Sequence, residues 1–226
     1  MRRKRAKPLR NASSPGWTVA RLLGWWLLLG LACFAASTVT AAETKTLVFF
    51  GDSLTAGYGL LDPDEAYPAL IQKKIESAGL PWHVVNAGLS GDTTAGGLRR
   101  LDWILRQKTD LIVLELGAND GLRGILPAVT RTNLRAIIER IRERRPGTIV
   151  VLAGMQVPTN LGPEHTRAFA AIYPELAKEL NVPLIPFLLA GVGGRAELNQ
   201  ADGLHPTAAG HKILAENVWV VIKPLL

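Results

Sequence analysis

Short apolar runs alternate with longer amphipathic stretches from Lys45 to the end of the chain. Each run is rich in Val, Ile, Leu or Phe and ends near Gly, Asn or Pro. The runs are Thr46–Phe50, His83–Asn86, Leu111–Leu116, Thr148–Ala153 and Val182–Ile185. Continuous apolar runs of this length are typical of strands that are buried on both faces of a parallel sheet.

The stretches between and after these runs have the apolar spacing of helices. They are Tyr67–Ser77, Thr94–Gln107, Ala128–Arg145, His165–Leu180 and Thr207–Ile222. In the third of them, Leu134, Ile137 and Ile141 fall on one face, with Arg and Glu on the other. This alternation predicts an α/β fold, a three-layer α/β/α sandwich around a five-stranded parallel sheet in flavodoxin-like order. We expect residues 43–226 to form it as a single domain.

The first 42 residues differ in character from the rest. Residues 1–21 contain seven Lys or Arg and no acid, whereas residues 22–42 carry no charge and end in small residues. A basic region, an apolar region and a small-residue region in this order are typical of a secretory signal peptide. We therefore predict a signal peptide over residues 1–42, cleaved after Ala42, and a periplasmic or secreted mature protein.

Two alternatives stand beside cleavage at Ala42. Residues 22–42 are long enough to span a bilayer, so an uncleaved inner-membrane anchor is the second interpretation. Lipoprotein cleavage before Cys33 is a weaker third, because apolar sequence continues past that cysteine. The Thr- and Ser-containing end of the segment and its final Ala41-Ala42 favour the first interpretation.

Loss of the signal would change the charge of the chain. The formal net charge is +7, but seven of the 26 Lys and Arg residues precede residue 22, and the other 19 balance the 19 Asp and Glu. The basic excess therefore belongs to export and gives no support for nucleic-acid binding. Cys33 is the only cysteine and would leave with the signal, so we expect neither a disulfide nor a cysteine metal site.

Polar, glycine-rich segments follow four of the predicted strands. They are Gly51–Gly57, Asn86–Asp92, Gly117–Gly121 and, after a longer loop, Asp202–Pro206. Ligands bind open α/β sheets beyond the carboxyl ends of the strands, which share one rim. The four segments are therefore expected to meet at a single site.

Ser53 is the candidate nucleophile of that site. Residues 43–226 contain three serines, and only Ser53 directly follows a predicted buried strand. Ser77 falls at a helix end on the opposite side, and Ser90 lies in a loop that is better suited to supply backbone donors. A serine after a strand is equally suited to cap a helix, so the interpretation depends on a partner base.

His205 is the candidate base, with Asp202 to orient it. Asp202 precedes His205 by three residues in a loop, which lets the carboxylate reach one ring nitrogen while the other faces Ser53. The other histidines are expected elsewhere: His83 begins a strand, His165 begins a helix, and His211 lies within the last helix.

Three N–H donors are candidates for an oxyanion hole. The Ser53 and Gly91 backbone amides and the Asn119 side chain all fall at the predicted rim. Ordinary turn chemistry is the alternative for Gly91 and Asn119. The chain has no H-E-x-x-H, G-x-G-x-x-G or G-x-x-x-x-G-K-[ST] motif, so we expect no metal and no cofactor. Position 55 is threonine, which disfavours the G-x-S-x-G elbow of α/β-hydrolases.

Four blocks of residues resemble those of the SGNH/GDSL hydrolases, in the same order. The blocks are Gly51–Leu54, Ser90–Thr93, Gly117–Asp120 and Asp202–Pro206. The stretches Glu115–Gly124 and Ala168–Pro174 resemble the exported bacterial thioesterase, lysophospholipase and arylesterase branch in particular. The resemblance implies Ser53 as nucleophile, Asp202 and His205 as the rest of the triad, and Ser53, Gly91 and Asn119 as oxyanion donors. Gly88 also lies near the second block, but the Gly-Asp-Thr order fits Gly91.

The same resemblance implies hydrolysis of acyl esters and thioesters of differing chain length. Apolar loop residues are candidates for the acyl groove, unless they only pack the loops: Leu122, Ile125, Val157 and Pro158, with Leu126, Pro127 and Leu161 beside them. The alternatives are a carbohydrate O-acetylesterase and an inactive, membrane-anchored binding module. We expect a monomer that acts on small molecules and does not stay on the membrane once its signal is cleaved.

Overall fold

The computed structural model describes residues 43–158 and 161–226, and the predicted signal peptide lies outside this part. The strands are β1 (Lys45–Gly51), β2 (Trp82–Asn86), β3 (Leu111–Glu115), β4 (Ile149–Ala153) and β5 (Leu184–Ile185). All neighbouring pairs are parallel, and the order is β2-β1-β3-β4-β5, which confirms the flavodoxin-like prediction. The central strand β3 is buried throughout, and β1 is buried from Leu47 to Gly51, as their apolar runs require.

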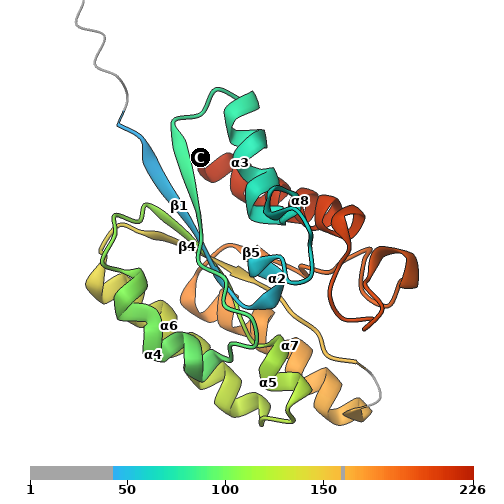
Figure 1. The fold of residues 1–226 in the computed structure, drawn as a ribbon. Helices are drawn as coiled ribbons and strands as arrows, with labels where there is room; N and C mark the ends of the chain where they lie inside the picture. The colour runs from blue at the N-terminus through green and yellow to red at the C-terminus, as the bar shows by residue number, and fades with distance from the viewer. Residues whose placement is uncertain (1–42, 159–160) are drawn as a thin grey trace, which may run out of the picture. The chain divides into compact units, whose positions relative to one another are not determined.

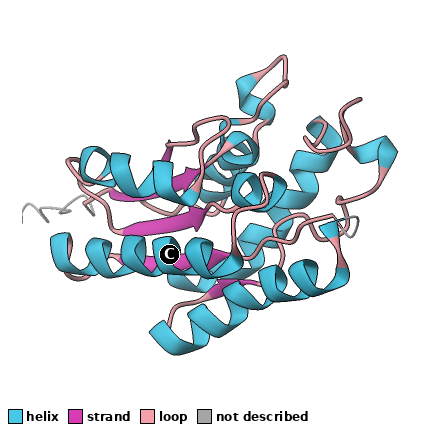
Figure 2. Cartoon of the chain, turned by 90° about the horizontal axis from the view of Figure 1, so that it is seen from below, coloured by secondary structure: helices cyan, strands magenta, loops and turns pink. Residues whose placement is uncertain are grey.

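Helices cover both faces of this sheet (Figures 1 and 2). The long helices α3 (Tyr67–Ser77) and α8 (Ala208–Ile222) lie together on one face. The other face carries α4 (Thr94–Ile104), α6 (Pro127–Arg144) and α7 (Pro163–Leu180). Within the described residues, no helix is both long and apolar enough to cross a membrane.

The ends of these helices follow from their sequences. Thr93 caps α4 by accepting a hydrogen bond from Gly96 N, and Thr207 caps α8 in the same way from Gly210 N. The apolar stripe predicted for α6 is buried in full. Gly97 lets α4 lie close to the sheet, because a Cβ there would overlap the Leu116 side chain.

The structure departs from the predicted elements at short segments. Strand β5 keeps only Leu184 and Ile185 of the run from Val182, since the flanking Pro183 and Pro186 have no N–H for a sheet hydrogen bond. Short helices α2 (Ser53–Ala56) and α5 (Ala118–Leu122) directly follow β1 and β3. The 3₁₀ turns are η1 (Pro63–Glu65), η3 (Ala196–Leu198) and η4 (Lys223–Leu225). Elements this short have no repeat that a hydrophobic pattern can reveal.

Candidate active site

Ser53 is the first residue of α2, directly after the carboxyl end of β1. Asp52 occupies the cap position, where its Oδ1 accepts a hydrogen bond from Leu54 N at 3.0 Å. The strand therefore turns into a helix at the serine, and Ser53 is almost fully buried, with 8% of its surface exposed. This local geometry holds the hydroxyl at the rim of the sheet, at the edge of a cavity.

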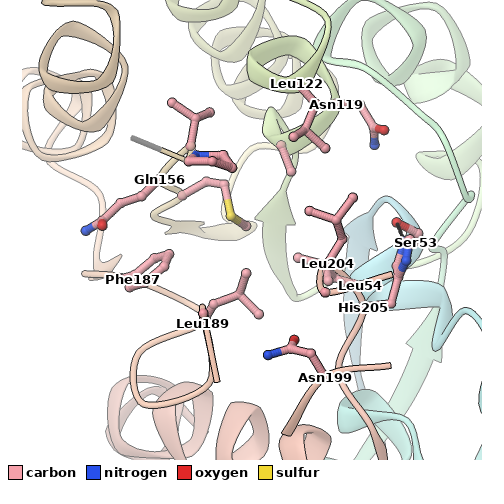
Figure 3. A pocket seen from close by; sticks show the side chains of 17 residues that line it. Ser53, Leu54, Asn119, Leu122, Gln156, Phe187, Leu189, Asn199, Leu204 and His205 are labelled. Atoms are coloured by element: carbon pink, nitrogen blue, oxygen red, sulfur yellow. Dashed lines mark hydrogen bonds between the residues drawn. The ribbon is translucent and has the colours of Figure 1, made fainter. Parts of the chain in front are cut away.

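Ser53, His205 and Asp202 form one hydrogen-bonded line. His205 Nε2 lies 3.0 Å from Ser53 Oγ, and His205 Nδ1 lies 2.7 Å from Asp202 Oδ2. The ring of Tyr58 packs against the His205 ring, with 4.6 Å between centroids. Figure 3 shows Ser53 and His205 side by side at one end of the cavity. The structure thus brings Ser53 together with the Asp202 and His205 side chains, which belong to a segment about 150 residues further along the chain.

A tight turn presents His205 to its carboxylate. Gly203 adopts a φ of 69°, which favours glycine, and the Asp202 Oδ1 then accepts N–H groups from Leu204 at 2.9 Å and His205 at 3.0 Å. The His205 backbone hydrogen bond, followed by that of its ring and by that of Leu204, lowers the pKa of Asp202 to about 2. Asp202 is therefore an anion at neutral pH.

The other serines and histidines lie away from this line. Ser77 is exposed at the end of α3, where its hydroxyl donates to Lys73 O, and Ser90 is exposed in a turn. His83 is exposed on β2. His211 is buried in α8, where its Nδ1 accepts from Tyr67 N at 3.2 Å, and burial lowers its pKa to about 4. His165 lies in α7 beside Phe169.

Asn119 and Gly91 come together around Asp92. The side-chain Nδ2 of Asn119, in α5, donates to Asp92 O at 2.9 Å and to Asp52 Oδ2 at 3.1 Å. Gly91 precedes Asp92 in an exposed turn, with a φ of 79° that favours glycine, and it does not itself line the cavity. The amide of Asn119 is thus held at the rim from two sides, with the Gly91 backbone next to one of its acceptors.

A pair of buried acids lies beneath Ser53. Glu115 Oε2 accepts hydrogen bonds from Asp52 N at 3.2 Å and Thr55 Oγ1 at 2.8 Å, and the Tyr67 hydroxyl lies 2.7 Å from Thr55 Oγ1. Burial raises the pKa of Asp52 to about 6, and burial together with the charge of Asp52 raises the pKa of Glu115 well above its usual range. This pair was not predicted from the sequence, although an acid within the apolar run Leu111–Leu116 was an available signal.

The buried pair Asp52 and Glu115 makes the folded protein less stable as pH rises. In the folded chain Glu115 keeps a proton that the unfolded chain releases above about pH 4.5, so stability falls as pH rises beyond that value. We expect Glu115→Gln to flatten this fall between pH 5 and 8, by up to about 1.4 kcal/mol per pH unit. Urea unfolding at a series of pH values measures it, with the exposed Glu197→Gln as control. Parallel curves for wild type and Glu115→Gln would contradict the expectation.

An apolar cavity of about 520 Å³ opens beside Ser53 and His205. Leu122, Val157 and Pro158 line it, as expected from the sequence. Its other apolar walls were not predicted, because they come from loops and from the short helix α2, which show no periodicity: Leu54, Met155, Phe187, Leu189 and Leu204. Figure 3 shows the cavity running from Ser53 and His205 toward Phe187 and Gln156.

Ile125 was wrongly expected to line this cavity. The chain reverses at Gly124, which has a φ of 67°, and Ile125 N bonds back to Asp120 O at 2.9 Å. Beyond this turn Ile125 is half-buried and is not among the residues that line the cavity, whereas Leu122, before the turn, is. Leu126 and Leu161 are also exposed and are not part of the lining. Within residues 43–158 and 161–226, no group of three or more His, Asp, Glu or Cys side chains is arranged to hold a metal ion.

Comparison with known proteins gives consistent matches over most of the chain. The model of the GDSL-like lipase/acylhydrolase family matches residues 49–213. Esterase TesA of Pseudomonas aeruginosa is 44% identical over 201 residues, which are 88% of this chain and 98% of that protein. Thioesterase 1/protease 1/lysophospholipase L1 of Escherichia coli K12 is 39% identical over 190 residues, 84% of this chain and 88% of that protein. A crystal structure of TesA superimposes with a TM-score of 0.77 at 45% identity and covers 80% of this chain and 100% of the other.

Proposed function

This chain belongs to the GDSL-like lipase/acylhydrolase family, and from that membership we propose that Ser53, His205 and Asp202 hydrolyse acyl esters and thioesters through an acyl-enzyme. The observation that carries the proposal is the line of hydrogen bonds from Ser53 Oγ through His205 to Asp202, at 3.0 and 2.7 Å, at the mouth of an apolar cavity. The relatives named esterase, thioesterase and lysophospholipase support the same reaction class.

The first half of the reaction forms the acyl-enzyme. His205 Nε2 takes the proton of Ser53 Oγ as that oxygen attacks the acyl carbonyl carbon. Asp202 stays ionised and holds the protonated imidazole in place. The negative oxygen of the tetrahedral intermediate accepts hydrogen bonds from Ser53 N, Gly91 N and Asn119 Nδ2, competing with Asp52 for the Asn119 amide. The carbon–oxygen or carbon–sulfur bond then breaks, and His205 gives its proton to the leaving alcohol or thiol.

The second half reverses these roles with water. His205 takes a proton from a water molecule, which attacks the acyl-enzyme carbonyl, and Ser53 leaves with the proton that His205 returns to it. A fluorophosphonate probe tests the mechanism directly, because it forms a covalent bond only with an activated serine. We expect one label per chain, on Ser53, together with hydrolysis of nitrophenyl esters. A chain that neither takes the label nor cleaves these esters would contradict the proposal and favour a binding module.

The substrates are proposed to be small molecules with an apolar acyl chain. Leu122, Met155 and Phe187 give apolar walls to a cavity whose volume of about 520 Å³ exceeds what an acetyl group needs. This favours ester and thioester hydrolysis over carbohydrate deacetylation. A nitrophenyl ester series from acetate to dodecanoate separates the two, since activity confined to acetate would favour deacetylation.

The absence of a side chain at Gly193 is expected to leave space in the cavity for a long acyl chain. A Cβ at this position would make ordinary contacts with Phe187 and Leu189, at 3.6 and 3.7 Å, so a larger side chain would extend into the cavity that all three residues line. We expect Gly193→Leu to lower kcat/KM for dodecanoate by at least about 10-fold and for acetate by less than about twofold, because each buried methylene contributes about 0.8 kcal/mol. The exposed Val220→Leu on α8 serves as the control. Equal losses for both esters would contradict this role.

Export is proposed on the pattern of residues 1–42. A basic segment, an uncharged apolar segment and a small-residue end favour delivery to the periplasm or beyond with cleavage after Ala42, and an uncleaved anchor is the alternative. We propose that the mature chain acts as a monomer. N-terminal sequencing of the protein from an expressing bacterium tests the cleavage: Glu43 as the first residue is expected, and an intact Met1 end would support the anchor.

A further inference from the structure

Arg100 lies in the second half of α4, and its side chain donates three hydrogen bonds. Its Nε donates to Asp92 Oδ2 at 2.7 Å, Nη1 to Ala87 O at 2.9 Å and Nη2 to Gly51 O at 2.9 Å. The guanidinium also lies over the ring of Phe50, with 4.4 Å from Cζ to the centroid. The side chains of Arg100 and Asp92 are 20% and 7% exposed, so this ion pair is largely shielded from water. The reaction as described above does not use it.

The three acceptors belong to the segments that carry the proposed oxyanion donors. Gly51 is two residues before Ser53, and its carbonyl also accepts from Leu89 N at 3.0 Å. Asp92 follows Gly91, and its backbone carbonyl accepts from Asn119 Nδ2 at 2.9 Å. A single guanidinium therefore connects the end of β1, the end of β2 and the turn before α4. The Asn119 amide joins this set through Asp92.

The residues around Arg100 leave room for its hydrogen bonds to Asp92, Ala87 and Gly51. Helix α4 starts at Thr94, directly after the turn that contains Gly91 and Asp92, and lies on one face of the sheet (Figure 1). Gly96 leaves room for the Asp92 carboxylate, since a Cβ there would overlap Asp92 Oδ1. The flat fork of a guanidinium reaches three acceptors at fixed angles, whereas a lysine ammonium is a single point charge.

We propose that Arg100 is a positioning residue, which holds the backbone of Gly51 and Asp92 so that the Ser53, Gly91 and Asn119 donors converge on one oxyanion. The inference rests on the proposed function, because it takes these three groups as the donors. It adds a residue that touches neither substrate nor His205. Displacement of catalytic groups by about 1 Å is enough to cost on the order of 10²-fold in rate, so the loss of such a contact has a measurable effect.

Arg100→Lys tests the proposal through its kinetic pattern. We expect kcat for nitrophenyl butyrate to fall by about 10- to 100-fold, with KM within about twofold, because the donors act mainly on the transition state. The acid limb of the pH profile should not move, since Arg100 does not contact His205. Arg99→Lys, on the exposed side of the same helix, is the matched control and should keep wild-type kcat. Wild-type kcat in Arg100→Lys would overturn the inference.

A double-variant cycle with Asn119→Ala separates positioning from a general loss of structure. We expect Asn119→Ala alone to lower kcat by about 10²- to 10³-fold. If Arg100 acts partly through Asp92 on the Asn119 amide, the two substitutions remove part of the same effect. The fold-loss of kcat in the double variant should then be smaller, by a factor of about five or more, than the product of the fold-losses in the two single variants. Full multiplication of the losses would overturn the inference and leave the proposed function intact. Wild-type turnover in Asn119→Ala would overturn the oxyanion assignment, and the inference with it.

A second variant covers the case in which Arg100→Lys does not fold. Asp92→Asn keeps the backbone carbonyl that holds Asn119, removes the charge that faces Arg100 Nε and leaves one side-chain oxygen as an acceptor. We expect a loss of kcat at nearly constant KM here too, and the same incomplete multiplication with Asn119→Ala. Thermal unfolding and circular dichroism of each variant establish that the folded protein is being assayed. A folded Asp92→Asn variant with wild-type kcat would overturn the inference.

Discussion

Ser53→Ala is expected to lower ester turnover by about 10⁴- to 10⁶-fold and to abolish labelling by a fluorophosphonate. The variant loses the hydroxyl that is hydrogen-bonded to His205, at 3.0 Å from its Nε2. Without that oxygen no acyl-enzyme can form, and only the binding and oxyanion groups are left to assist the attack of water. KM should change little, since the apolar cavity that binds the acyl chain is unaltered.

Two further serines provide the comparison for this experiment. Ser77→Ala and Ser90→Ala remove exposed hydroxyls at the end of α3 and in the turn before α4, and both should keep wild-type turnover and labelling. Rapid-quench measurement of nitrophenol release adds a second readout, because a burst requires an acyl-enzyme. A Ser53→Ala protein that keeps more than about 1% of wild-type turnover, or that takes the label on another residue, would overturn the assignment of the nucleophile.

The sequence predicts the sheet well because its strands are buried on both faces. Leu47, Val48, Phe49 and Phe50 are fully buried in β1, so burial alone requires an unbroken apolar run there. The same logic fails for β5, where two prolines leave the strand only two residues. Helix α3 has the predicted bounds, whereas α2 and α5 are four and five residues long and show no period.

In the site too, contacts between residues close in sequence could be predicted, whereas contacts between distant residues could not. Asp202 and His205 are three residues apart in one turn, so their spacing allows the pairing, and the presence of Ser53 at the same rim is what favoured it as a catalytic pair. The pairs Asp52 with Glu115 and Gly51 with Arg100 are separated by 63 and 49 residues. No spacing rule connects such residues; only packing of α4 and β3 against β1 brings them together. The same holds for the cavity walls at Met155 and Phe187.

Asp202→Asn is expected to lower kcat by about 10⁴-fold at neutral pH while leaving the fold intact, and the reason lies in which ring nitrogen carries the proton. In the wild type the carboxylate, with a pKa of about 2, accepts the proton on His205 Nδ1 and leaves Nε2 free to take one from Ser53. An amide N–H at the position of Oδ2 would instead donate to Nδ1. The proton would then sit on Nε2, which faces Ser53 and could no longer act as a base.

The test of this prediction separates the base from the nucleophile. Fluorophosphonate labelling of Asp202→Asn should be slowed by a similar factor but still end on Ser53, whereas Ser53→Ala should never label. Because the Asn side chain keeps one oxygen for the N–H groups of Leu204 and His205, the melting temperature should stay close to wild type. Asp64→Asn, an exposed change in η1, is the control. A loss of less than about 10-fold in Asp202→Asn would mean that His205 receives its orientation from another group, and the triad assignment would then be wrong.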